Sequence, residues 1–146
     1  MAYSIEYIQE EGGLIVHWHG AVEGKEVIRS YYERYSPLER LQSLRYIITD
    51  YSDVTHFNMN PEDVRTIAEI ARQAAKHNHN IFGVAAMPAA LAYGIARMWQ
   101  GYASDEETGW RTRVVKTRKE AEDWLLANLD KNLSFRCAQK NTARNL

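Results

Sequence analysis

The sequence has little cysteine, almost no net charge and no long apolar run, and each shortage excludes a class of protein. A single cysteine, Cys137, excludes an internal disulfide and a four-cysteine zinc site, and fits a reducing cytoplasm. The formal net charge of −1 gives no electrostatic reason to expect nucleic acid or an anionic membrane as a partner. No apolar run approaches the roughly 20 residues that span a bilayer, and the first residues do not read as a secretion signal. We therefore expect a cytoplasmic domain without a membrane span.

Short motifs that carry common enzyme chemistry are also missing. The chain contains no Gly-x-Ser-x-Gly nucleophile turn, no glycine-rich phosphate loop, no Cys-x-x-Cys pair and no His-Glu-x-x-His helix. These absences favour a non-enzymatic protein that needs no cofactor.

The stretch from residue 44 to residue 87 predicts the class of the fold. Residues 44–51 are apolar on consecutive positions, which indicates a strand covered on both faces, and a loop is expected over 52–59. Asn60 and Pro61 then begin a helix as cap and first residue, and its apolar stripe runs to residue 75. A second apolar run over 81–87 completes a strand-helix-strand unit. Parallel strands need such a crossover, so the class is α/β.

The remaining segments fill in the order of elements. Residues 3–7 and 14–18 alternate as a hairpin around a turn at 10–13. Helical spacing begins near residue 25 and stops before Pro37; residues 37–43 are ambiguous between coil and a helical turn. We expect further helices over 88–102 and 117–129, an irregular acidic segment over 103–109 and an exposed edge strand over 110–116.

These elements predict one α/β domain over residues 1–130. Its sheet is mixed but mostly parallel, with about five strands, an N-terminal antiparallel hairpin and about four helices. From residue 130 onward the apolar pattern fades and basic residues outnumber acids. Residues 131–146 are therefore expected to be a loosely held basic tail.

This order of elements resembles the SpoIIAA-like, STAS-type domains, named after sulfate transporters and anti-sigma factor antagonists. The resemblance covers roughly residues 3–129. It rests on the stretch 46–54 before a capped helix, on the helix containing residues 93–98 after an apolar strand, and on the closing residues 119–125.

The resemblance implies a regulatory or protein-interaction module that binds a protein partner or a second copy of itself. Antagonists of that family carry an Asp-Ser-Ser/Thr-Gly signature whose hydroxyl is phosphorylated, and the equivalent position here is Asn58-Met59-Asn60. No hydroxyl stands there, so we do not expect phosphorylation to switch this site. A divergent branch resembles the lipid-binding CRAL-TRIO fold, which implies a small apolar-ligand carrier as the alternative.

Ligands of open α/β sheets favour the carboxyl ends of strands and the adjoining helix N-termini. The sequence places six residues there as a candidate surface for a ligand or partner. The alternative is that Asn60 only caps a helix and the acids only solvate a loop. The six are Asp50, Asp53, His56, Asn58, Asn60 and Met87.

Other polar residues suggest chemistry that is less well supported by the sequence. His17 and His19 share a strand face at a spacing that suits a metal, but a third ligand would have to come from elsewhere. Asp50, Asp53 and His56 form a compact trio for acid-base catalysis only if they converge in a cleft. A surface role fits all of these residues better, so we expect no metal and no catalytic group.

Two further groups of side chains have both a structural and a binding interpretation. Arg97, Arg111 and Arg113 could bind an anion, but such arginines more often keep an edge strand from associating. Aromatic residues are plentiful on the expected helices. Most should be core, and any surplus would make a helical surface suited to a partner or a homodimer. They are Tyr31, Tyr32, Tyr35, Trp99, Tyr102 and Trp124.

Overall fold

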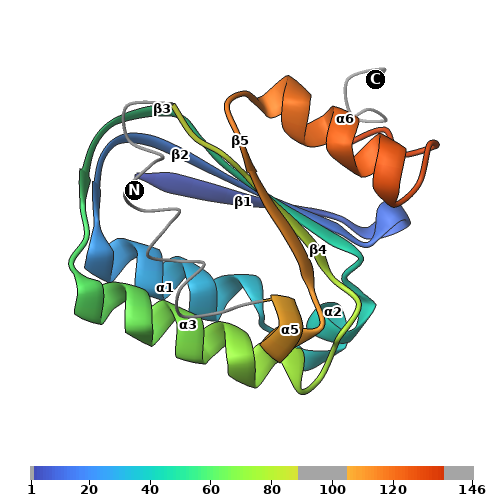
Figure 1. Cartoon of the computed structure of the whole chain (residues 1–146), viewed down its shortest axis with the longest axis horizontal. Coiled ribbons are helices and arrows are strands. Elements are labelled where there is room, and N and C mark those ends of the chain that lie inside the picture. The colour runs from blue at the N-terminus through green and yellow to red at the C-terminus, as the bar shows by residue number, and fades with distance from the viewer. Residues whose placement is uncertain (1, 89–104, 137–146) are drawn as a thin grey trace, which may run out of the picture.

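Five strands form one sheet in the order β1-β2-β3-β4-β5 in a computed structural model that describes residues 2–88 and 105–136 (Figure 1). β1 and β2 are antiparallel, whereas β2, β3, β4 and β5 run parallel to one another. The predicted α/β class, the strand number and the N-terminal hairpin are confirmed. The strands are β1 (Tyr3–Ile8), β2 (Gly13–Glu23), β3 (Tyr46–Asn58), β4 (Phe82–Ala86) and β5 (Arg111–Val115).

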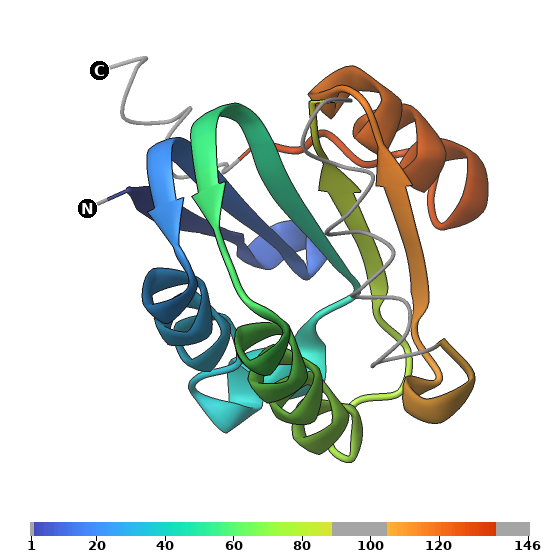
Figure 2. The same ribbon diagram turned by 60° about the vertical axis from the view of Figure 1, so that its left-hand side comes forward.

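Helices cover both faces of this sheet. Figures 1 and 2 show α1 and α3 side by side on one face and α6 on the other. The described helices are α1 (Gly24–Arg34), α2 (Leu38–Ser43), α3 (Pro61–Ala75), α5 (Asp105–Thr108) and α6 (Arg118–Asn128), with a 3-10 turn η1 (Gln9–Glu11). No helix in these described segments is long and apolar enough to cross a membrane.

Two helices were not assigned by the sequence pattern. α2 resolves the ambiguous segment 37–43 as a helix, and α5 lies where an irregular acidic segment was expected. In α5, the Asp105 carboxylate accepts hydrogen bonds from the backbone and hydroxyl of Thr112, which fastens this short turn to β5. The helix predicted over 88–102, with Arg97, Trp99 and Tyr102, lies outside the described residues apart from Pro88.

β3 is the central strand, as predicted. It pairs in parallel with β4 from Tyr46 opposite Phe82 to Asp50 opposite Ala86, so the two apolar runs lie side by side. The loop predicted over 52–59 is wrong, because β3 continues to Asn58. β2 extends to Glu23 and pairs with this longer strand. The register between the two strands shifts twice, between His17 and His19 and between Gly20 and Ala21.

The sheet separates two hydrophobic cores. Toward α1 and α3 lie alternate strand residues such as Trp18, Ile47 and Tyr51, packed with Ile67 of α3. Toward α6 lie the intervening residues, including Ile48, packed with Ala121 and Leu125 of the helix. Both faces of β3 are therefore buried, which is why its apolar residues are consecutive.

The start of α3 follows the sequence prediction closely. The Asn60 side chain accepts a hydrogen bond of 2.8 Å from the Asp63 backbone, and the Asp63 carboxylate accepts one of 3.2 Å from the Asn60 backbone. This reciprocal cap satisfies two donors that a helix N-terminus otherwise leaves unpaired. The six positions of the predicted apolar stripe are also the buried ones: Val64, Ile67, Ala68, Ala71, Ala74 and Ala75.

The first part of the predicted tail is held against the sheet. Leu133 is buried in the core under α6, and the Phe135 ring lies 5.6 Å from that of Tyr46 between centroids. The Glu11 carboxylate accepts hydrogen bonds from the Ser134 backbone and hydroxyl and from the Phe135 backbone. Residues 131–136 are thus anchored by η1, and the prediction of a loosely held tail is wrong for them. Their sequence is mostly polar and has no sustained helical or strand periodicity from which this could be predicted. Cys137 and the rest of the tail lie outside the described residues.

This anchor should make stability depend on pH. Burial raises the pKa of the Glu11 carboxyl, but hydrogen bonds from Ser134, Tyr46 and Phe135 outweigh it and hold the pKa below its ordinary value of 4.5. A lowered pKa means that the folded chain binds the proton less readily than the unfolded chain. The stabilisation is therefore complete above about pH 4.5 and is lost as the pH falls through the folded pKa.

We expect Glu11→Gln to lower the free energy of unfolding by roughly 1–2 kcal/mol at pH 7, since it removes charge-assisted hydrogen bonds. Urea denaturation at neutral and acidic pH measures this directly. The difference between wild type and E11Q should shrink at acidic pH, where the wild-type carboxyl is protonated. Glu10→Gln changes an exposed neighbour and serves as the control. A difference that is the same at both pH values would contradict the assignment.

Candidate functional site

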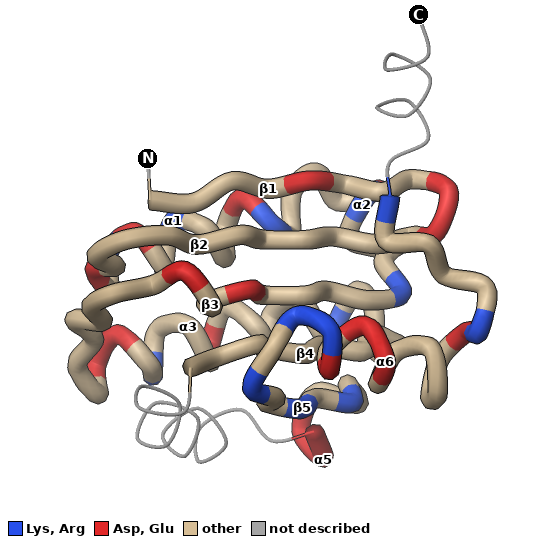
Figure 3. Tube along the Cα trace, turned by 90° about the horizontal axis from the view of Figure 1, so that it is seen from above, with Lys and Arg blue, Asp and Glu red and all other residues tan. Residues whose placement is uncertain are grey.

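A cluster of polar side chains lies where β2 and β3 pass the start of α6. The parallel register places His17 of β2 opposite Asp50 of β3, both on the face that α6 covers. Arg118 is the first residue of α6, whose N-terminus is capped by the Thr117 side chain. Figure 3 shows acidic positions of β3 beside the basic start of α6.

His17 lies between two carboxylates. Its Nδ1 atom is 3.4 Å from Asp50 Oδ2, and its Nε2 atom is 3.0 Å from Asp53 Oδ2. The Asp50 side chain is 5% exposed, whereas those of His17 and Asp53 are 36% and 65% exposed. The group is thus buried at one end and open to solvent at the other.

Asp50 is the buried centre of the cluster. Its Oδ1 atom accepts hydrogen bonds from the Ser52 backbone, at 2.9 Å, and from the Ser52 hydroxyl. Its Oδ2 atom is 3.7 Å from Nη1 of Arg118. Arg118 is held in turn by Glu122, one helical turn along α6, with 2.8 Å between Nε and Oε2. We call His17, Asp50, Ser52, Asp53 and Arg118 the polar cluster.

The side chains of the polar cluster are paired with one another. Each ring nitrogen of His17 faces a carboxylate oxygen of the cluster. Each charged member of the cluster has a partner of opposite charge or a donor. Across the described residues, no group of three or more histidine, cysteine or acidic side chains is placed to hold a metal ion.

The structure brings together two of the six predicted site residues, Asp50 and Asp53. His56 lies further along β3, where its Nδ1 atom is 3.2 Å from the Thr55 hydroxyl. The Asn58 amide donates to Glu23 at 2.9 Å, and Asn60 caps α3. His17, and not His56, therefore occupies the position between the two carboxylates.

Met87 lies on the opposite side of the sheet from Asp50. It is 3% exposed and belongs to the core packed under α1 and α3. A partner at the polar cluster would not reach this buried side chain.

Two members of the polar cluster, Ser52 and Arg118, were not singled out by the sequence. The sequence places Ser52 in the expected loop over 52–59 and Arg118 in the expected helix over 117–129, without a site role for either. His17 was considered as a metal ligand with His19, but the register shifts between these two positions and His19 is exposed. The sequence pattern predicts the helix that begins near Arg118, but only the packing of α6 on the sheet brings Arg118 to Asp50.

The predicted group of arginines does not form a described anion site. The Arg111 guanidinium lies 5.3 Å from the centroid of the Phe82 ring, and Arg113 is exposed on the same edge strand. This placement fits the protective role expected on an edge, where β4 is the described neighbour of β5. Arg97 lies outside the described residues.

Fold and site together define a class: an α/β protein whose described five-stranded sheet is covered on both faces and carries a charged cluster within β2 and β3, level with the carboxyl end of β4. No protein-family model matches the chain, and no curated protein matches it. The resemblance to STAS-type domains therefore stays a prediction based on element order and sequence pattern.

Proposed function

We propose that this chain is a protein-recognition module of STAS-like type that binds its partner through the polar cluster, and that it is not an enzyme. The observation that carries the proposal is the exposure gradient around His17. Asp50 is buried and fixed, while the Asp53 side chain is 65% exposed at the surface. The buried Asp50, held by Ser52 and Arg118, can fix the orientation of a partner, and the exposed Asp53 beside it can provide electrostatic complementarity to the partner surface.

The absence of the phosphorylatable hydroxyl supports constitutive recognition. At the position equivalent to the family signature, Asn58 is engaged with Glu23 and Asn60 caps α3. Neither side chain accepts a phosphoryl group. A cytoplasmic location is part of the same proposal, and the single cysteine is consistent with it.

Charge reversal at Asp53 tests the recognition surface. We expect Asp53→Lys to weaken partner capture by roughly tenfold or more, because a like charge placed against a complementary surface costs at least about 1.4 kcal/mol. The measurement is affinity capture with quantitative mass spectrometry, followed by titration of the captured protein. Glu39→Lys makes the same change of charge at an exposed position of α2 and should leave capture unchanged.

A second copy of the chain is the alternative partner. Tyr32 of α1 is 60% exposed and Leu38 of α2 is 47% exposed, beside a surface groove between α1, α2 and α3. Tyr32 is the one exposed residue among the described members of the aromatic set predicted from the sequence. Light scattering across a range of concentrations separates the two cases. A strict monomer that captures no protein through Asp53 would refute the recognition proposal.

The CRAL-TRIO-like alternative requires an enclosed, lipid-sized cavity. The groove between α1, α2 and α3 has a volume of about 470 Å³, but it is open at the surface and not enclosed. The cavity that the described residues line under the sheet has a volume of about 80 Å³. Pockets for drug-sized ligands typically occupy about 300–1,000 Å³. The alternative is therefore kept only for much smaller ligands.

A further inference from the structure

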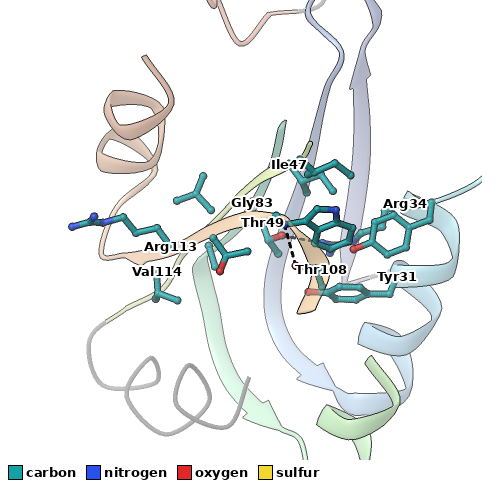
Figure 4. A pocket seen from close by; sticks show the side chains of 14 residues that line it. Tyr31, Arg34, Ile47, Thr49, Gly83, Thr108, Arg113 and Val114 are labelled. Atoms are coloured by element: carbon teal, nitrogen blue, oxygen red, sulfur yellow. Dashed lines mark hydrogen bonds between the residues drawn. The ribbon is translucent and has the colours of Figure 1, made fainter. Parts of the chain in front are cut away.

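The cavity of about 80 Å³ lies between the sheet and the helical layer of α1 and α5, on the face opposite the polar cluster. Its walls are largely apolar, from β3, β4 and β5, and include Ile47, Gly83 and Val114. Arg34 and Thr49 line it from α1 and β3 (Figure 4). Arg113 also borders it, but Figure 4 shows its side chain pointing away from this group.

Arg34 is unusual because it is charged and almost completely buried. The residue is 2% exposed, and its Nη1 atom donates a hydrogen bond of 3.1 Å to the Thr49 hydroxyl. Its Nε and Nη2 atoms are buried and have no hydrogen-bond partner among the described residues. Three of the five N–H donors of the guanidinium, one on Nε and two on Nη2, are thus unused inside the described part of the protein.

Nothing in the described surroundings neutralises this charge. No carboxylate of residues 2–88 or 105–136 forms a salt bridge with Arg34. The guanidinium carbon lies 3.7 Å from the centroid of the Tyr31 ring, whose face attracts a cation. Burial raises the pKa of Tyr35 and of Tyr51, and the nearby Arg34 guanidinium opposes part of that rise; both phenols stay neutral.

A buried cation without a counter-ion costs several kcal/mol, which a ring face only partly offsets. An anion in the adjoining cavity would offset this charge. Because the Nε and Nη2 atoms are themselves buried, the guanidinium would have to turn toward the cavity for the anion to accept hydrogen bonds from them. The guanidinium fork matches a carboxylate in a bidentate geometry. One positive charge and apolar walls favour a singly charged organic anion over a phosphate dianion, which needs more donors.

We infer that Arg34 binds the carboxylate of a short organic acid in this cavity, with the hydrocarbon part of the acid against Gly83 and Val114. The volume limits its size. At roughly 10–15 Å³ for each water-sized position, about 80 Å³ holds roughly five to eight non-hydrogen atoms. Butyrate falls within that range, whereas a long-chain fatty acid does not. This site is separate from the polar cluster and does not depend on the proposed partner binding.

Thermal unfolding of the full chain in sodium butyrate tests the inference, with sodium chloride at equal ionic strength and neutral butyramide as reference solutes. At tenfold its Kd, butyrate should raise the Tm by about 3–6 °C, since ligand binding adds RT ln(1 + [L]/Kd). Calorimetric titration should show one saturable site. Butyramide has the same shape without the charge and should leave the Tm near its value in chloride.

Two substitutions connect the effect to Arg34. Arg34→Met removes the charge while keeping a long apolar side chain, and should abolish the butyrate-dependent rise in Tm. Arg34→Lys keeps the charge without the fork and should weaken butyrate binding by on the order of tenfold. If R34M does not fold, the wild-type and R34K titrations still decide the question.

Any of three results would overturn the inference. The wild type could show no saturable response to butyrate, R34M could respond to butyrate as strongly as the wild type, or butyramide could raise the wild-type Tm as much as butyrate does. A rise in Tm with inorganic phosphate but not with butyrate would overturn the carboxylate assignment.

Discussion

Replacing Trp18 with alanine is expected to lower the free energy of unfolding by about 3–5 kcal/mol, as for other large buried aromatic residues. Trp18 is completely buried in β2, on the face covered by α1 and α3. Its ring lies 4.6 Å from that of Tyr3 and 6.0 Å from that of Tyr51 between centroids. The substitution would remove the contact through which both neighbouring strands pack their aromatic residues.

Urea denaturation followed by far-ultraviolet circular dichroism is the suitable measurement, because the substitution removes a tryptophan and alters fluorescence. Trp124→Ala deletes the same group from α6, where the ring is partly buried and lies 5.9 Å from Phe82. Its effect should be clearly smaller. Equal losses for W18A and W124A would contradict the placement of the main core between the sheet and α1 and α3.

Replacing Leu125 with alanine is expected to cost about 2–5 kcal/mol. Leu125 is 0% exposed and packs α6 against the sheet, together with Ile48 and Val84. α6 also carries Arg118, which reaches Asp50 in the polar cluster. Loosening this helix should therefore weaken the recognition surface as well as the fold, so a partner titration of L125A is expected to show lower affinity.

The same substitution at an exposed leucine provides the control. Leu38 is 47% exposed on α2, and L38A should change the free energy of unfolding by no more than about 0.5 kcal/mol. Urea denaturation of the two variants gives the comparison. If L125A were as stable as L38A, α6 would not be docked through its apolar stripe.

Pattern and capping predicted α3 most accurately among the elements. Asn60, Pro61 and the apolar stripe are local signals, and they fix the start and the buried face without help from the rest of the chain. The same holds for the N-terminal hairpin and for the central position of β3. In each case the information lies within a few neighbouring residues.

The extension of β3 to Asn58 could not be predicted from local sequence. Residues 52–58 have the polar composition of a loop, and they form a strand because β2 runs alongside them as far as Glu23. Residues 131–136 are a second example, since their order depends on Glu11, more than a hundred positions earlier. Hydrogen bonds between distant segments override local propensity in both places.

Pairing register explains the outcome at the polar cluster. Asp50 and Asp53 were recognised as site residues, but the choice of histidine depends on which residue of β2 lies opposite Asp50. Two helices, α1 and α2, separate β2 from β3, so no turn fixes their register as it does in a hairpin. Arg118 comes from still further along the chain.

The sequence by itself determined the α/β class, the order of the strands along the chain, the cap of α3 and the two apolar faces of the central strand, because these follow from local periodicity. The tertiary structure alone decided that His17 lies between Asp50 and Asp53, and that Arg34 is buried beside a small cavity. Both results depend on which distant side chains the strand register and helix packing bring together. A charged residue on a helix carries no local sign of the surroundings in which packing will place it.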